Sequence, residues 1–267
     1  MPGTYLHENI YTHSKKRKIN IKRLLLLMAF LCIIAVMPVI YSPLFAVKNI
    51  QVVGNKNISS GEVIKATSFF YNKNLLMIKK RDVQKAIYES IPVKEVQINY
   101  RLPHTLVICI KEREIAAALP YLGSFVLIDS DGIVVKIVPK LDYLAVPVVT
   151  GFNVTHASVA GQPVIENNAD SFKKFLELIS AVSPIASELS EIHVTVDESN
   201  DTTFYLYTLD GFKVFLGCYD DKKIPVMKQI LEDLRKNNRG KGELNISGDT
   251  PVFKPFNREG EGKEGKP

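Results

Sequence analysis

The sequence contains one pair of residues with the spacing of a nucleophilic catalyst. Ser171 and Lys174 fit the S-x-x-K pattern of penicillin-binding enzymes, in which the serine hydroxyl attacks a carbonyl carbon. Those enzymes also need S-D-N and K-T-G motifs, and neither string occurs in this chain. Ser171 opens a predicted amphipathic helix, where a serine hydroxyl commonly accepts hydrogen bonds from backbone N–H groups. The pair therefore predicts a structural serine in preference to an active site.

The residue types that bind metals do not form a recognised ligand pattern. Asp129-Ser130-Asp131-Gly132 resembles the beginning of a calcium loop, but the further acidic positions and the closing glutamate are missing. A hairpin turn is therefore expected there. The histidines have no HExxH spacing and the cysteines form no CxxC pair; these residues are His7, His13, His104, His156, His193, Cys32, Cys109 and Cys218. The sequence predicts no cofactor, no metal site and no disulfide framework.

Other catalytic and binding signatures are also missing from the sequence. It has no P-loop, G-x-S-x-G or G-x-G-x-x-G string, so we expect no enzyme and no small-molecule substrate. The net charge of +6 could suggest a nucleic-acid binder. However, residues 1–23 contain six Lys/Arg and one acid, and the rest of the chain has 28 basic against 27 acidic groups. We therefore expect no nucleic-acid binding.

The basic tail is followed by a run that is long enough to cross a membrane. No charged residue occurs in the 24 positions from Leu24 to Val47, and roughly 20 apolar helical residues span a hydrocarbon core. We expect a transmembrane signal anchor over 24–46, with residues 1–23 as a cytoplasmic basic tail by the positive-inside rule. The alternative is a cleaved signal peptide, but its apolar region is shorter and ends in an A-x-A site, which residues 42–46 do not show.

Apolar periodicity predicts a small β-α-α-β-β unit over 47–119. A strand over 47–53 precedes a helix for which Ser59 is the expected N-cap. A second helix carries its apolar residues at i, i+3, i+4, i+7 and i+8 from Val83. Residues 93–113 then alternate apolar and polar side chains on both sides of Leu-Pro-His, which predicts a hairpin. Each helix has one apolar stripe, so both must cover one face of the sheet.

The remaining chain predicts a β-rich mixed domain with two helices over 120–256. One helix is expected to start near Asp170 and the other near Pro225. Short strands surround them, and the last two are expected over 243–247 and 252–256. Residues 257–267 are a Gly/Glu/Lys low-complexity segment, for which disorder is expected. The predicted fold class is α+β, after a single transmembrane helix.

A β-α-α-β-β unit behind a signal anchor resembles a POTRA domain (polypeptide-transport-associated). The chain resembles the FtsQ/DivIB family of bacterial division proteins at Pro92-Val93, Val96, Arg101-Leu102-Pro103, Thr105-Leu106, Ile108, Glu112-Arg113 and Ala116. That family ends the hairpin with Glu-Arg-x-Pro-Val-Ala, and here Ile115 replaces the proline. Residues 146–151 resemble the family's Leu-Pro-x-x-x-Gly. The likeness covers residues of about 24 to 256, so the second domain is expected to be FtsQ-type.

The resemblance implies a non-enzymatic divisome scaffold, a single-pass type II membrane protein concentrated at the septum. In that family the last strands bind small coiled-coil proteins of the FtsB/DivIC and FtsL type, and the complex helps control septal peptidoglycan synthesis. Carried over by position, the partner-binding residues are Val252, Phe253, Lys254 and Phe256. Alternative functions are a signal-anchored extracytoplasmic enzyme, a POTRA-type secretion component and, because of Asn-x-Ser/Thr strings, a eukaryotic type II glycoprotein; these strings start at Asn57, Asn153, Asn200 and Asn245.

The residues themselves also point to the last strand as an edge. The segment from Thr250 to Phe256 has proline at 251 and 255, and proline is tolerated in a sheet at edges, strand starts or bulges. An edge strand offers unpaired backbone groups to another chain. Phe253 and Phe256 would serve as aromatic anchors. The alternative is that both rings are simply buried against the final helix.

Overall fold

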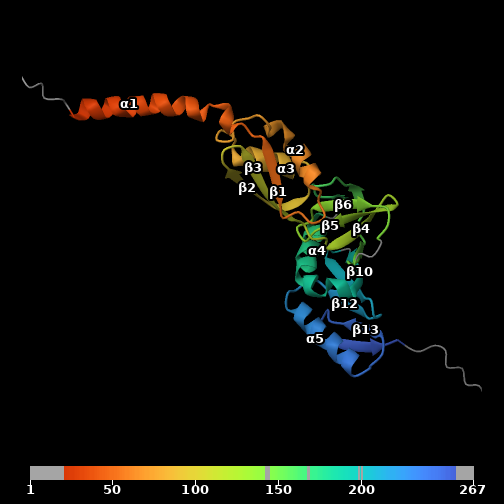
Figure 1. Ribbon diagram of the computed structural model, residues 1–267. Helices are drawn as coiled ribbons and strands as arrows, with labels where there is room; N and C mark the ends of the chain where they lie inside the picture. Colours follow the sequence, from red (N-terminus) through yellow and green to blue (C-terminus); the bar gives the residue numbers. More distant parts are fainter. Residues whose placement is uncertain (1–20, 142–144, 167–168, 198, 200, 257–267) are drawn as a thin grey trace, which may run out of the picture.

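The computed structural model describes residues 21–141, 145–166, 169–197, 199 and 201–256 (Figure 1). The expected cytoplasmic tail and the expected disordered segment 257–267 lie outside the described residues, apart from positions 21–23. A long N-terminal helix leads into a small α/β unit, and a larger sheet with its helices follows (Figure 1). The predicted α+β class is confirmed.

The long helix α1 spans Ile21–Ile40, and its segment Ile21–Val39 is long and apolar enough to cross a membrane. Its 20 residues extend about 30 Å, the thickness of a hydrocarbon core. The helix ends before the expected limit of 46. Ser42 is extended because it precedes Pro43, and a short 3-10 turn over Pro43–Phe45 follows.

The small unit has the predicted element order. It consists of β1 (Asn49–Val53), α2 (Ser60–Thr67), α3 (Lys80–Tyr88), β2 (Val93–Arg101) and β3 (Thr105–Glu112). The strand order is β1-β3-β2, with β1 parallel to β3 and β2 antiparallel to it. Ser59 caps α2, as predicted, because its Oγ accepts from Gly61 N at 3.2 Å.

One hydrophobic core joins the two helices to this sheet. Val63 of α2 and Ile87 of α3 are fully buried against Leu106 and Ile108 of β3. Val47 is also fully buried in this cluster, although it closes the uncharged run in the sequence. The chain therefore enters the folded unit within seven residues of the end of α1.

The larger unit is built on a nine-stranded sheet in the order β14-β13-β12-β11-β10-β7-β4-β5-β6. Its strands are β4 (Ala117–Tyr121), β5 (Ser124–Ile128), β6 (Val134–Val138), β7 (Val148–Thr150), β10 (Leu189–Val196), β11 (Thr202–Thr208), β12 (Lys213–Gly217), β13 (Gly242–Asn245) and β14 (Val252–Pro255). A separate pair is formed by β8 (Val154–His156) and β9 (Val164–Ile165). Because β4 starts at Ala117, the second sheet begins inside the segment expected to close the first domain.

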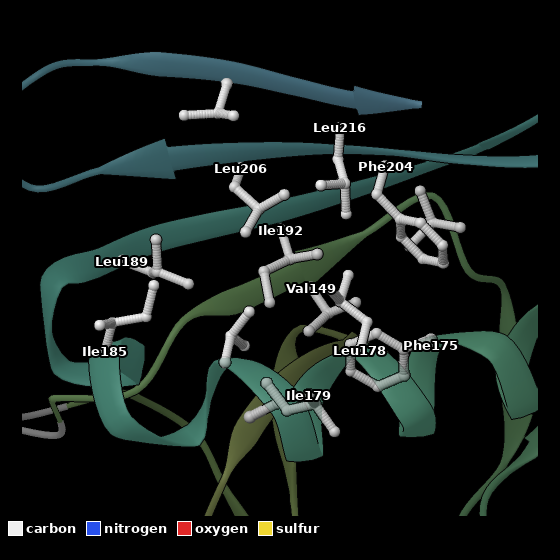
Figure 2. Close-up of a cluster of buried hydrophobic side chains, with 14 of the residues drawn as sticks. Val149, Phe175, Leu178, Ile179, Ile185, Leu189, Ile192, Phe204, Leu206 and Leu216 are labelled. Atoms are coloured by element: carbon white, nitrogen blue, oxygen red, sulfur yellow. The ribbon is translucent and has the colours of Figure 1, made fainter. Parts of the chain in front are cut away.

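Two helices, α4 (Ala169–Val182) and α5 (Lys223–Lys236), bury their apolar stripes on one face of this sheet. Figure 2 shows Phe175 and Leu178 of α4 beside Val149, and Ile179 and Ile192 belong to the same buried cluster. Of the apolar residues of α4 that its periodicity predicts to face inward, Phe172, Phe175, Ile179 and Val182 are buried and Leu176 is half-buried. Burial of each large aliphatic or aromatic side chain contributes about 1.5–3 kcal/mol, so this core holds the strands that follow α4 in register.

Two adjacent residues at the end of β3 contact different units. Glu112 accepts hydrogen bonds from Lys56 N at 2.5 Å, Asn57 N at 2.8 Å and Ile58 N at 2.8 Å, all in the loop before α2. Arg113 forms an ion pair with Asp129, and its Nη1 lies 2.9 Å from Asp131 Oδ2. Successive side chains of an extended segment point to opposite sides. The dipeptide therefore connects the loop of residues 56–58 in the small unit to the turn of residues 129–132 in the large unit.

The turn of residues 129–132 is held by an arginine and by its own backbone. Asp129 is 2% exposed, and its Oδ1 accepts from Asp131 N at 3.0 Å and from Ile133 N at 2.9 Å. The hairpin turn expected between β5 and β6 is confirmed. Its buried carboxylate is neutralised by Arg113. Burial alone would lower the pKa of Arg113, but the hydrogen bonds and charges of Asp129 and Asp131 raise it above its ordinary value.

We expect Glu112→Gln to destabilise the small unit by roughly 1 kcal/mol at pH 7, because an amide accepts N–H groups more weakly than a carboxylate. Burial alone would raise the pKa of Glu112, but the backbone N–H groups of Ile58, Lys56 and Asn57 lower it below 4.5. A depressed folded-state pKa supplies stability above the unfolded value that is lost as the pH falls. The difference in unfolding free energy between wild type and variant, measured by urea unfolding, should therefore be largest at pH 7 and shrink below about pH 4.5.

The matched control is Glu114→Gln, which changes an exposed carboxylate two residues away. Its effect should stay within about 0.5 kcal/mol at each pH. A difference in unfolding free energy between wild type and Glu112→Gln that is constant from pH 7 to pH 3 would show that the carboxylate charge does not hold the loop.

Candidate partner-binding strand edge

The possible catalytic serine is a structural residue. Ser171 is 4% exposed, and its Oγ accepts a hydrogen bond from Thr202 Oγ1 at 2.9 Å. Lys174 lies exposed on α4. Over the described ranges, no group of three or more His, Cys, Asp or Glu side chains could hold a metal ion.

The last strand of the large sheet has backbone N–H and C=O groups on one side that pair with no described strand. β14 pairs with β13 in an antiparallel register that sets Asn245 opposite Val252 and Gly242 opposite Pro255. It is the terminal strand of the sheet order, and no described strand pairs with its other side. In Figure 1 this end of the molecule, beside β13 and α5, lies far from α1. The predicted edge position of the last strand is therefore observed.

Within β14, one residue directs both its backbone N–H and its backbone C=O away from β13. Phe256 N donates to Lys241 O at 3.0 Å, so this pair is of the hydrogen-bonded kind. Hydrogen-bonded and non-hydrogen-bonded pairs alternate in an antiparallel ladder. Lys254 and Val252 thus direct their backbone groups at β13, whereas Phe253 and Pro255 direct theirs away. Since proline has no N–H, Phe253 supplies the single outward N–H within β14.

The side chains of the four predicted residues divide into two groups. Val252, Lys254 and Phe256 are exposed. Phe253 is half-buried, because its ring packs on the core and lies 6.2 Å from the ring of Phe212. A Cβ at Gly242 would come 2.6 Å from the Phe253 ring, so the missing side chain at 242 makes room for it. The interpretation that both rings are buried is wrong for Phe256.

The outer face of the sheet, opposite α4 and α5, carries an aromatic and charged row that the sequence analysis missed. Tyr205 of β11 stacks on Phe215 of β12 at 4.5 Å, and Lys213 Nζ lies 5.0 Å from the Tyr205 centroid. Lys213 also pairs with Glu243 of β13 at 3.5 Å, and Glu243 is opposite Lys254. The alternation of Tyr205 and Tyr207 with inward Phe204 and Leu206 was the available signal. A strand added to β14 would place alternate side chains beside this row.

A lysine from α5 positions the loop that leads into β14. Lys223 Nζ donates to the carbonyls of Leu216, Cys218 and Ser247 at 3.0, 3.1 and 3.1 Å. One ammonium group thus joins the helix, the end of β12 and the loop after β13. Nothing in the local sequence marks this role, because the three carbonyls are brought together only by the fold.

Two family models match the chain in succession. Residues 45–113 match the POTRA domain, FtsQ-type. Residues 120–246 match the C-terminal domain of cell division protein FtsQ/DivIB. Together they cover most of the chain, and β14 lies just beyond the second match.

Curated relatives carry the same family name. Cell division protein DivIB of Clostridium botulinum is 26% identical over 91% of this chain and 94% of its own length. DivIB of Staphylococcus aureus is 22% identical over 75% of this chain, and the chain spans only 43% of that relative. The major extracytoplasmic domain of DivIB from Geobacillus stearothermophilus is 17% identical over 48% of this chain and 98% of that structure, with a TM-score of 0.34. By its two successive family matches and the DivIB sequences to which it is similar, the chain belongs to the FtsQ/DivIB family of cell-division proteins.

Proposed function

We propose that this chain is a non-enzymatic divisome scaffold that binds coiled-coil division proteins of the FtsB/DivIC and FtsL type. The free outer edge of β14 on a member of a cell-division family is the observation that carries the proposal. The bound proteins would help assemble or regulate septal peptidoglycan synthesis. The proposed placement is a single pass through the cell membrane by α1, with the basic residues 1–23 in the cytoplasm and the rest outside.

Strand addition is the proposed mode of binding. A partner strand would accept from Phe253 N–H and donate to the carbonyls of Phe253 and Pro255, and these main-chain bonds would give affinity. Val252 and Lys254 would flank the added strand on the outer face, and Phe256 would meet it beyond the end of β14. The Phe253 ring would hold β14 on the core instead of touching the partner.

The proposed absence of enzymatic activity is supported by the position of the candidate nucleophile, Ser171. A serine that is buried and bonded to Thr202 offers no oxygen to a substrate. Ser171→Ala is therefore expected to leave division unaffected. Robust cell-wall hydrolase or acyltransferase turnover by the purified chain, abolished by this change, would support the enzyme alternative.

A fluorescent fusion is expected to concentrate at midcell, and coiled-coil division proteins are expected to co-purify with the chain from dividing cells. The matched control ends the chain after Asp249, which removes β14 and retains both family-matched regions. This variant should reach the membrane in equal amount yet retain none of the partners. A uniform membrane signal would contradict the division role, whereas undiminished co-purification without β14 would contradict only the proposed edge.

A further inference from the structure

The end of the small unit that receives α1 is fixed by backbone hydrogen bonds. Leu75 N donates to Phe45 O at 2.7 Å, and Val47 N donates to Lys73 O at 2.9 Å. Lys48 N donates to His104 O, in the turn between β2 and β3, at 2.9 Å. The loop of residues 68–79 and the turn of residues 102–104 therefore lie beside the segment that leaves the helix.

Exposed apolar side chains gather at this end. Met77 is 56% exposed and Leu102 is 59% exposed. We call the following set the membrane-proximal patch: Leu44, Phe69, Leu76, Met77 and Leu102. The strongly exposed apolar residues elsewhere in the small unit are Val53 and Tyr88, at the far ends of β1 and α3. Exposed apolar groups that cluster in this way mark an interaction surface.

The charges around the membrane-proximal patch are mostly positive. Within residues 68–82 there are four basic side chains and one acid, Asp82. Lys73 Nζ lies 5.0 Å from the centroid of Phe69, and the exposed Tyr41 stands at the end of α1. Aromatic rings and lysines that extend past apolar groups are typical of the headgroup level, where anionic lipids attract basic residues.

The short connection leaves the patch little room to move away from a bilayer. Phe45 is the fifth residue after Ile40, the end of α1, and five residues reach at most about 17 Å. Three of them form the 3-10 turn of Pro43–Phe45, which shortens this reach. The headgroup layer beyond the hydrocarbon is roughly 5–7 Å thick on each side. A helix that spans the membrane thus holds the patch next to that layer.

We propose that the membrane-proximal patch binds the lipid headgroup region of the leaflet from which α1 emerges. Its apolar side chains enter the boundary between headgroups and acyl chains, and the nearby lysines contact phosphate groups. This contact sets the tilt of the small unit over the membrane and so the direction in which the distant β14 edge is presented. The inference rests on the proposed membrane anchoring by α1 and is independent of the partner edge.

Single tryptophans test this contact, because the chain contains no tryptophan of its own. The full chain carrying Met77→Trp is reconstituted in vesicles of phosphatidylglycerol and of phosphatidylcholine with bromine atoms near the headgroup end of one acyl chain. Bromine quenches tryptophan at close range, so Met77→Trp should lose most of its fluorescence relative to unbrominated vesicles. Leu102→Trp, at the other side of the patch, should behave in the same way. It tests the same contact if Met77→Trp does not fold.

Two further variants separate the possible outcomes. Leu209→Trp replaces a 67% exposed leucine in the turn before β12, far from α1 in Figure 1, and should keep its fluorescence. Met37→Trp lies three residues before the end of α1, near the depth of the bromine atoms, and should be quenched. Quenching in α1 without quenching at 77 and 102 would overturn the lipid contact and leave the anchor intact. A signal that changes at 77 only after coiled-coil partners are added would overturn it in favour of a protein surface. An unquenched Met37→Trp would contradict the anchoring itself.

Discussion

Phe253→Pro is expected to weaken capture of the coiled-coil partner strongly while the sheet remains folded. The substitution removes the single outward N–H of β14, and proline is tolerated on the free side of an edge strand. A lost main-chain hydrogen bond with its partner group left unsatisfied costs roughly 1–3 kcal/mol, which is about a 5- to 150-fold loss of affinity. Binding of purified partner to immobilised chain in detergent measures the change.

Phe253→Ala is the matched control, because it removes the ring and keeps the N–H. The ring packs on the core near Phe212, so its loss should mainly lower stability and weaken binding less than Phe253→Pro does. Circular dichroism checks that both variants retain their sheet. Equal losses of affinity would assign the effect to the ring, and intact binding in both would show that the partner uses another surface.

Arg113→Met is expected to destabilise the junction of the two units by about 3 kcal/mol, because it leaves the buried Asp129 carboxylate without its cation. With an m-value of about 1–3 kcal/mol per molar urea, the unfolding midpoint should fall by about 1–3 M. The effect should exceed that of any surface charge, since Asp129 is 2% exposed. Urea unfolding of the detergent-solubilised chain, followed by circular dichroism, measures the midpoint.

Two controls define the cause of that loss. Arg101→Met changes an exposed arginine that donates to Gln51 Oε1 at 3.1 Å, and its effect should stay within about 0.5 kcal/mol. In the double variant Arg113→Met/Asp129→Asn, the asparagine Oδ1 can still accept from Asp131 N and Ile133 N. It should recover at least half of the lost stability. A double variant as unstable as Arg113→Met alone would assign the effect to lost packing instead of an unpaired charge.

Local patterns in the sequence were sufficient for the main elements. The uncharged run after Arg23 predicted a helix that could span a membrane, and a helix of that kind begins at Ile21. The alternation in residues 93–113 predicted the hairpin of β2 and β3, and the two prolines predicted the edge strand at β14. Each of these signals depends on periodicity or on proline geometry within a few neighbouring residues. The expected domain limits at 47, 119 and 256 and the partner-binding role of the four residues stay predictions.

The sequence by itself therefore determined the order and type of the elements and the location of an edge strand that contains proline. Only the tertiary structure decided that Glu112 and Arg113 bind different units, that Ser171 is bonded to Thr202 and that the Phe253 ring faces the core. These contacts join residues 16 to 56 positions apart or depend on which face of the nine-stranded sheet α4 and α5 cover. Periodicity specifies one face of one element, whereas packing between elements selects the atoms that meet there.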